Sequence, residues 1–339
     1  MPTQIISRWF ITMMMAAWVS IPAQALDLKR SDVSSFIDKM VSTYQFDRTQ
    51  LENTLRGADS KQSILDAISK PAEKTIPWFE YRERFLIDKR INRGKSFQVE
   101  HQAMLNKLAG DGAPVAEILG ILGVETMYGE ITGRFRVLDA LTTLGFDYPP
   151  RADFFRYELE QFLLLSREQK VAADQPLGSY AGAMGAPQFM PHSYREFGAD
   201  GDGDGKVDLW NNWDDVLASV ANYLKQHGWR SGEPVVTDAV LTSIDTSAFT
   251  LGDVTLNETV ASLRAKGVKF VTTLPDTAPA VLLSLQGKDG PVYRVGFNNF
   301  YVITRYNRSP LYANTVYDLG QLITNTGGAA LVQQPVSKK

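Results

Sequence analysis

The order in which hydrophobic patterns follow one another restricts the fold of this chain most. Over residues 31–112, apolar residues recur three and four positions apart, the spacing of amphipathic helices. Over 113–229 the pattern is again helical, but glycine-rich turns interrupt it. Short β-leaning runs occupy 231–295, and a helical segment follows residue 307. Helices and strands are therefore segregated along the chain, which predicts an α+β fold that is predominantly α.

Single elements are expected at defined places. Ser31 is expected to cap the first helix, whose apolar residues at helical spacing are Val33, Phe36, Ile37, Met40 and Val41. Further helical segments are predicted at 55–68, 79–108, 257–266 and 312–324, and a helix is expected to begin at Ala140, next to Asp139. The β-leaning runs are 234–236, 280–285 and 292–295.

The 339 residues suffice for two or three modest domains, and the chain has no internal repeat. The expected division is a signal peptide (1–25), an α-domain (26–112), a catalytic core (113–230) with an Asp-rich loop (200–215), a small β-domain (231–295), a return to the core (296–325) and a flexible tail (326–339). The tail is rich in Gly, Ala, Gln and Lys, as mobile ends often are.

The N-terminus has the pattern of a targeting segment. Arg8 precedes the mostly apolar run 10–21, and Pro22-Ala23-Gln24-Ala25 supplies the small residues that signal peptidase reads. The apolar run is shorter than the roughly 20 residues that span a bilayer. We therefore expect cleavage after Ala25 rather than the alternative, an uncleaved membrane anchor. An exported chain without cysteine suggests a bacterial envelope, so the expected location is the periplasm.

Composition excludes several classes of protein. Lys and Arg number 35 against 38 Asp and Glu, so the chain lacks the basic excess of a nucleic-acid binder. With no cysteine there is no disulfide framework, thiol nucleophile, cysteine zinc site or lipid-modified N-terminal cysteine. The three histidines, His101, His192 and His227, lie far apart in sequence and offer little for a metal cluster; the last two are expected at the surface or at helix ends.

An Asp-Gly segment resembles the calcium loop of an EF-hand. Loop positions 1, 3, 5 and 9 are occupied by Asp200, Asp202, Asp204 and Asp208. Gly205 stands at position 6, where a sharp turn is needed, and Lys206 at position 7 offers its carbonyl. Asn211 stands where a bidentate glutamate belongs, so a longer loop ending on Asp214 or Asp215 is expected. We interpret the loop as a structural calcium site; the alternative is a solvated Asp-Gly turn.

A second motif, GVETMYG at 123–129, places a carboxylate at the end of an apolar helix. Apolar surroundings disfavour the charged form of Glu125, which would raise its pKa and suit it to general acid catalysis. Without further context, a glutamate at a helix end is more commonly solvated or paired.

The segment 179–191 combines small residues with an amide and an aromatic ring. Small residues let backbone approach a ligand, and carbohydrate grooves use amides and flat rings. The alternative is a turn for helix packing. The tryptophans present a similar choice, and core packing is favoured over sugar platforms for Trp78, Trp210, Trp213 and Trp229.

In this order, GVETMYG, YAGAMGAPQFMP, the Asp-Gly loop and Tyr306-Asn307 resemble the family of membrane-bound lytic murein transglycosylase B, in its soluble form. The resemblance implies a lysozyme-like core with an N-terminal α-domain and a small β-domain. It further implies cleavage of the β-1,4 bond between N-acetylmuramic acid and N-acetylglucosamine in peptidoglycan. The family closes the muramyl C6 hydroxyl onto C1 without water, which makes it a lyase of cell-wall turnover that leaves a 1,6-anhydro end.

Residue roles follow from the same resemblance. Glu125 matches the single catalytic acid and base. The residues implied to bind substrate are Ser179, Tyr180, Gln188, Tyr223, Tyr306, Asn307 and Tyr312. The implied Ca²⁺ ligands are Asp200, Asp202, Asp204, Lys206 through its carbonyl, Asp208 and Asp215. Asn211 replaces a family aspartate, and one residue is inserted near Asn212.

Two other functions remain alternatives. A hydrolytic muramidase needs a positioned water and releases reducing ends, whereas a noncatalytic wall-binding protein would have no use for Glu125. No second acid stands out near the motifs, since Glu130 is expected at the surface and Asp139 at a helix start. The expected partners are peptidoglycan glycan strands, with the protein acting as a monomer and binding no nucleic acid.

Overall fold

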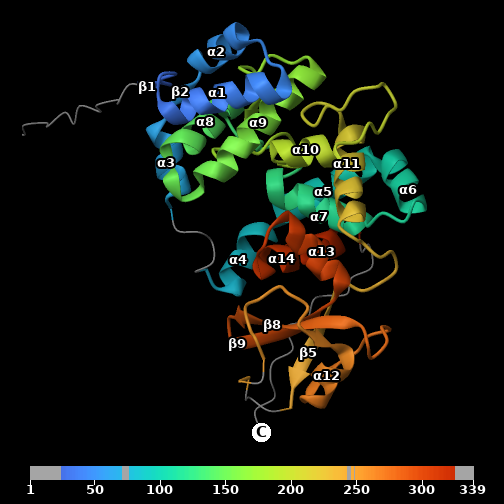
Figure 1. Ribbon diagram of the computed structural model, residues 1–339. Helices are drawn as coiled ribbons and strands as arrows, with labels where there is room; N and C mark the ends of the chain where they lie inside the picture. Colours follow the sequence, from blue (N-terminus) through green and yellow to red (C-terminus); the bar gives the residue numbers. More distant parts are fainter. Residues whose placement is uncertain (1–23, 71–75, 243–245, 248, 325–339) are drawn as a thin grey trace, which may run out of the picture.

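A computed structural model describes residues 24–70, 76–242, 246–247 and 249–324. Helices make up most of it, and a five-stranded sheet lies at the end opposite α1 (Ser31–Tyr44) and α2 (Arg48–Arg56) (Figure 1), which confirms the α+β class with a predominance of helix. No helix in this part of the chain is long and apolar enough to cross a bilayer. The predicted flexible tail and nearly all of the predicted signal peptide lie outside the described residues.

The N-terminal elements are β1 (Gln24–Ala25), α1 (Ser31–Tyr44), α2 (Arg48–Arg56), β2 (Asp59–Ser60) and α3 (Gln62–Ile68). β1 pairs with β2 in antiparallel register, so the predicted cleavage site falls at the end of a short strand. Arg30, not Ser31, occupies the N-cap of α1. The Arg30 guanidinium bonds to Asp147 and to the Phe146 carbonyl, which fixes the approach of the chain to the helix.

The predicted helix at 55–68 is wrong, because β2 interrupts it. The Asp59 amide donates to the carboxylate of Asp139 at 3.0 Å, and the Lys61 amide donates to Thr143 Oγ1 at 3.1 Å. Both acceptors lie on another helix, α8 (Val137–Asp147), so this backbone satisfies its hydrogen bonds with a distant part of the chain rather than within a helix.

The predicted helix at 79–108 consists of three helices: α4 (Trp78–Phe85), α5 (Asp88–Glu100) and α6 (Gln102–Gly110). Arg90 explains the first break. Its guanidinium donates to the carbonyls of Arg84 and Phe85 at 2.9 and 3.0 Å, and so satisfies groups that α4 leaves open at its end.

The central elements are α7 (Val115–Thr126), β3 (Phe135–Arg136), α8 (Val137–Asp147), the 3₁₀ turn η2 (Pro149–Arg151), α9 (Ala152–Gln169), β4 (Leu177–Gly178), α10 (Pro191–Phe197) and α11 (Trp213–Gln226). α8 begins earlier than predicted, so Asp139 lies inside its first turn. That carboxylate is fully buried and pairs with Lys61 and Arg136. The short strands β3 and β4 pair and join the segment after α7 to the segment before residue 179.

The sheet consists of β5 (Val236–Leu241), β6 (Glu258–Thr259), β7 (Val268–Phe270), β8 (Pro279–Gly287) and β9 (Gly290–Gly296) in the antiparallel order β6-β8-β9-β5-β7. α12 (Val260–Ala265) packs on it and shares a separate apolar core with its strands. Two predicted β-leaning runs lie within β8 and β9, whereas the run at 234–236 only reaches the first residue of β5. The predicted helix at 257–266 contains α12 but begins as β6.

The chain then returns to the helical body through α13 (Asn298–Tyr306) and α14 (Pro310–Thr324). α13 was not predicted, since its Phe-Tyr-Val-Ile-Thr run favours strands by propensity and is helical here. α14 crosses α7 closely: a Cβ on Gly120 would lie 2.1 Å from the Val316 carbonyl oxygen, and one on Gly320 would lie 2.2 Å from that of Ala116. This crossing brings the end of α7 next to the start of α14.

Candidate active site

Glu125 lies in the last turn of α7 and is half-buried. The hydroxyl of Tyr312, in the first turn of α14, donates a hydrogen bond to Glu125 Oε1 at 2.7 Å. Burial, and next the charge of Glu125, raise the pKa of Tyr312 well above its ordinary value. Tyr312 therefore remains a neutral donor that holds one oxygen of the carboxylate.

A second tyrosine, Tyr306, lies beside Tyr312. Its ring lies nearly parallel to that of Tyr312, with centroids 6.4 Å apart, and its hydroxyl donates to the Pro187 carbonyl at 2.5 Å. Burial, followed by the charge of Glu125, raises its pKa as well. Tyr306 thus ties α13 to the segment 179–191.

Glu125 is also held from its C-terminal side. Thr126 Oγ1 donates to the Ala186 carbonyl at 2.8 Å and accepts from the Gly129 amide at 3.1 Å. The three residues after Thr126 all have left-handed backbone, with φ of 51° for Met127, 58° for Tyr128 and 83° for Gly129. Our sequence reasoning missed Thr126 as a contributor; the only signal was its place beside Glu125.

The segment 179–191 folds back on itself through its polar side chains. Ser179 Oγ accepts from the amides of Ala181 and Ala183 at 3.2 and 3.0 Å. Gln188 has left-handed backbone, and its Nε2 donates to the carbonyls of Thr132 and Gly185 at 3.0 and 2.9 Å. The side chain of Gln188 therefore links this segment to the loop that follows α7.

The remaining predicted substrate residues differ in their surroundings. Tyr180 and Asn307 are exposed. Tyr223 is buried: its hydroxyl donates to the Arg305 carbonyl at 2.7 Å, and its ring lies 4.8 Å from that of Tyr306. Its contacts support Tyr306 from behind.

Two other acids lie close to Glu125 in sequence. Glu130 is exposed, as predicted, and pairs with Lys89 at 3.3 Å and Arg93 at 3.8 Å, both on α5. Glu117, two turns earlier on α7, is buried, and burial raises its pKa to about 7.

The tryptophans and two of the histidines pack against other side chains of the protein. Trp78 is buried, and the other three tryptophans of the prediction are partly buried against the main core, as expected. His227 ends α11 and stacks on Tyr223. His192 starts α10, where a hydrogen bond from its ring to the buried Glu158 carboxylate, at 2.5 Å, raises its pKa.

The Asp-Gly loop has the geometry of a cation site. Carboxylate oxygens of Asp200, Asp202 and Asp204 lie within 4.8 Å of one another. Asp200 accepts the amides of Gly203 at 2.6 Å and Gly205 at 2.8 Å, and the Gly205 bond is the first cause that lowers its pKa. Both glycines have left-handed backbone, with φ of 82° and 86°. Three clustered carboxylates on a tight loop suit a hard cation such as Ca²⁺.

Asp215 braces the loop from α11. It is fully buried and accepts the amides of Gly201 at 2.8 Å and Asp208 at 2.7 Å. Burial is the main cause that raises its pKa, and the charges of Asp202 and Asp200 add to it. The carboxylate of Asp208 instead accepts the amides of the following turn, including that of Trp210 at 2.8 Å.

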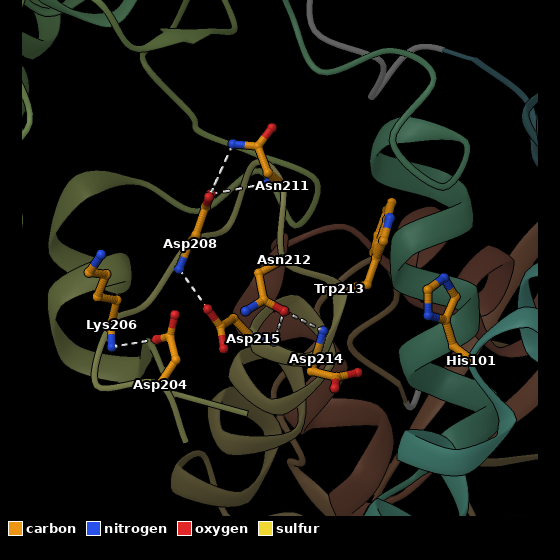
Figure 2. A pocket seen from close by; sticks show the side chains of 9 residues that line it. All are labelled: His101, Asp204, Lys206, Asp208, Asn211, Asn212, Trp213, Asp214 and Asp215. Carbon is orange, nitrogen blue, oxygen red and sulfur yellow. Dashed lines mark hydrogen bonds between the residues drawn. The ribbon is translucent and has the colours of Figure 1, made fainter. Parts of the chain in front are cut away.

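A depression of about 470 Å³ adjoins this loop (Figure 2). Asp204, Lys206 and Asp208 lie on one side of it, and Trp213 and His101 lie on the other. Asn212 caps α11 by accepting the Asp214 amide at 3.0 Å and donates to Asp202 at 2.9 Å. The first residues of α11 therefore connect the loop to the helical body.

Comparison with known proteins agrees with this arrangement. Residues 29–321 match the family described as the transglycosylase SLT domain. The chain is 39% identical to membrane-bound lytic murein transglycosylase B of Escherichia coli (strain K12) over 305 residues, 86% of this chain and 82% of that protein.

Three solved structures are also similar. Catenated lytic transglycosylase SltB1 of Pseudomonas aeruginosa gives a TM-score of 0.84 at 47% identity, covering 86% of this chain and 97% of that one. Escherichia coli Slt35 in complex with calcium gives 0.79 at 37%, covering 89% and 95%. Pseudomonas aeruginosa SltB3 in complex with NAG-anhNAM-pentapeptide gives 0.77 at 28%, covering 87% and 80%. The chain belongs to the SLT-domain lytic transglycosylases, enzymes with a lysozyme-like fold that cleave peptidoglycan.

Proposed function

We propose that this enzyme cleaves the β-1,4 bond between N-acetylmuramic acid and N-acetylglucosamine without water, using Glu125 as its single acid and base. The observation that carries the proposal is the contact between Glu125 and Tyr312. A half-buried carboxylate at a helix end accepts a hydrogen bond at Oε1 from a neutral phenol, which orients the carboxyl group for proton transfer.

In the first step, protonated Glu125 gives its proton to the glycosidic oxygen, and the bond from that oxygen to C1 of the muramyl residue breaks. An oxocarbenium-like centre develops at C1. In the second step, the muramyl C6 hydroxyl attacks C1 and the Glu125 carboxylate takes the hydroxyl proton, which restores the acid. A hydrolase would need a second carboxylate as nucleophile or to activate water. Here the nucleophile is part of the substrate.

The surrounding residues serve to bind and orient the glycan. We assign this role to Ser179, Tyr180, Gln188, Tyr223, Tyr306, Asn307 and Tyr312. Their support is the contact chain that joins Glu125, Tyr312, Tyr306 and the segment 179–191. The SltB3 complex adds chemical support, because that relative holds an anhydromuramyl fragment.

Product analysis tests this function directly. Purified peptidoglycan is digested with the enzyme, and the soluble fragments are weighed by mass spectrometry. We expect fragments lighter by one water than hydrolysed muropeptides, without reducing muramyl ends. Glu125→Gln should abolish them, whereas Glu130→Gln, which changes an exposed acid five residues away, should not. Reducing, hydrated products would show a muramidase, and full activity of Glu125→Gln would refute the role of that residue.

We further propose that the Asp-Gly loop binds Ca²⁺ as a structural ion. Asp200, Asp202 and Asp204 would hold it together with the Lys206 carbonyl. Asp208 and Asp215 would complete the set by exchanging the amides that their carboxylates accept here for the ion. The ion would neutralise the clustered carboxylates and so rigidify the loop. The calcium complex of Slt35 supports this choice of metal.

Thermal unfolding measures this binding. At a calcium concentration about 100 times Kd, the stabilisation is about 2.7 kcal/mol, so Tm should rise by several degrees over the value in chelator. Asp202→Asn should remove the shift and Asp289→Asn, an exposed change outside the loop, should keep it. An equal shift with magnesium, or none with calcium, would contradict the assignment.

Export to the periplasm is proposed from the N-terminal sequence and from the cell-wall substrate of the relatives. Mass measurement of the protein purified from the periplasm should give a mature N-terminus at Leu26. A chain that keeps residues 1–25 in the membrane fraction would show an anchor instead.

A further inference from the structure

We propose that Phe97, Tyr128 and Trp213, here called the aromatic brace, position Glu125 by holding the turn that follows it. This inference rests on the role proposed for Glu125. In this proposal the three rings of the aromatic brace do not contact substrate.

The turn needs a restraint because its backbone is strained. Met127, Tyr128 and Gly129 are consecutive and all left-handed, a conformation that costs free energy for residues with a Cβ. Hydrogen bonds from the amides of Met127 and Tyr128 to the carbonyls of Gly123 and Leu122, at 3.2 and 3.1 Å, close the end of α7. Such strain persists only where the surroundings hold it.

Tyr128 is held in a slot between two helices. A Cβ on Gly94 of α5 would lie 2.4 Å from the Tyr128 hydroxyl oxygen, and one on Gly123 of α7 would lie 2.5 Å from it. Glycine at both positions is what makes room for the ring. The hydroxyl is buried and has no hydrogen-bond partner among the described residues. The slot therefore fits the shape of the ring and does not bond to its polar group.

Trp213 and Phe97 close the brace. A Cβ on Gly129 would lie 2.9 Å from Cζ2 of Trp213, so the indole edge lies directly against the turn. The Phe97 ring lies 5.2 Å from that of Tyr128 and 4.7 Å, edge-on, from that of Trp213. Figure 2 shows Trp213 at the start of α11 beside His101, in the depression that adjoins the Asp-Gly loop. The aromatic brace therefore extends from the turn toward that loop.

The consequence concerns the direction of the Glu125 carboxylate. Tyr128 lies three residues after Glu125, in a turn continuous with α7. If the ring leaves its slot, the strained turn relaxes and the last helical turn moves with it. A displacement of about 1 Å at a reacting group can cost about 100-fold in rate.

The experiment compares Tyr128→Leu with Tyr128→Phe on soluble glycan fragments of alternating N-acetylglucosamine and N-acetylmuramic acid. Tyr128→Leu should lower kcat by about 10- to 100-fold, with KM nearly unchanged, and shift the pH midpoints of kcat/KM. Tyr128→Phe should keep the wild-type kcat. Its Tm should exceed that of the wild type by about 2 °C or more, because the change removes a buried hydroxyl without a partner.

Leu263→Ala is the matched control. Leu263 is fully buried in the separate core of the sheet, so this change lowers Tm without touching the turn. All variants are measured at a temperature where circular dichroism shows them folded. If Leu263→Ala loses as much kcat as Tyr128→Leu at equal Tm, or if Tyr128→Leu keeps wild-type kcat and pH midpoints, the brace has no positioning role.

A second route covers the case in which Tyr128→Leu does not fold. Gly94→Ala narrows the slot from α5 and should lower kcat, because the added Cβ would lie 2.4 Å from the Tyr128 hydroxyl oxygen and 2.6 Å from Cδ1 of Ile323. Adding Tyr128→Phe should recover the part of the loss that the hydroxyl causes. Absence of recovery would overturn the inference. Glu125→Gln, assayed in parallel, separates the two proposals: if it is fully active, the proposed function fails, whatever the brace variants do.

Discussion

Two glutamates of α7 differ in burial and in their hydrogen-bond partners. Glu125, at the helix end, is half-buried and bonded to Tyr312. Glu117 lies where α7 is covered, and burial raises its pKa to about 7. Both are acids on an apolar helix in the sequence, and only the structure shows that one is bonded to a tyrosine and the other is buried.

Tyr312→Phe tests the bond to Glu125. A hydrogen bond to a charged group contributes about 1.5–3 kcal/mol, so we expect kcat to fall by about 10- to 100-fold. Tm should change little, since the ring and its packing remain. Tyr301→Phe on α13 is the control and should retain wild-type kcat. Kinetics on the soluble glycan fragments give both values, and equal kcat for Tyr312→Phe and wild type would show that the bond is dispensable.

Glu117→Gln tests the pH dependence of stability. The pKa of Glu117 is about 7 in the folded protein against an ordinary value of 4.5, so the folded state binds the proton more tightly than the unfolded state. Its contribution to stability is therefore lost as pH rises from about 4.5 to 7. Above pH 7 the variant should be more stable by about 3 kcal/mol, and near pH 4 the difference should vanish. Urea unfolding across this range measures the difference in unfolding free energy between the variant and the wild type, and a difference that does not change with pH would contradict the prediction.

At the scale of elements, the crossing of α7 and α14 brings Glu125 to Tyr312. Gly120 and Gly320 let the backbones approach, each facing a carbonyl of the other helix at a distance that no side chain allows. The register of this crossing decides which residue of α14 lies opposite Glu125.

Gly120→Ala should therefore separate the helices. We expect a loss of about 1–3 kcal/mol in unfolding free energy and a drop in kcat, because Tyr312 moves away from Glu125. Gly110→Ala is the matched control: it lies at the end of α6 with no atom within 4 Å of the added Cβ, and should be neutral or stabilising. Chemical denaturation and kinetics compare the two, and similar behaviour of both variants would rule out the proposed crowding.

At the scale of the whole molecule, the sheet lies next to α4, α13 and α14 (Figure 1). Buried charged side chains join it to these helices. Arg294 of β9 donates to Asp318 and Asn314 of α14, each at 2.9 Å, and Asp318 also accepts from Arg82 of α4 at 3.2 Å. Arg294 and Asp318 are almost fully buried. α14 thus binds Arg294 through Asn314 and Asp318 and presents Tyr312, in its first turn, to Glu125.

Arg294→Met should cost about 3–5 kcal/mol, since it leaves Asp318 buried with one partner fewer. Arg264→Met, which breaks the exposed pair with Asp276, should cost less than about 1 kcal/mol. Differential scanning calorimetry distinguishes them, and an equal, small effect of both changes would show that the buried pair does not hold the sheet in place.

Sequence alone determined what depends on neighbouring residues. Helical spacing located α1 from Ser31, and β-leaning runs located β8 and β9. The Asp-Gly repeat predicted a loop whose three carboxylates do cluster. GVETMYG singled out Glu125. Periodicity and turn chemistry act over a few residues, so a linear pattern records them.

Tertiary structure decided what depends on distant partners. The break at Asp59 arises from bonds to α8, and the contact of Tyr312 with Glu125 spans 187 residues of sequence. The slot of Tyr128 needs Gly94 from another helix, and Tyr223 supports Tyr306 through the Arg305 carbonyl. No local pattern encodes these pairings, because they follow from how whole helices pack, and packing selects partners by shape and by the need to satisfy buried polar groups.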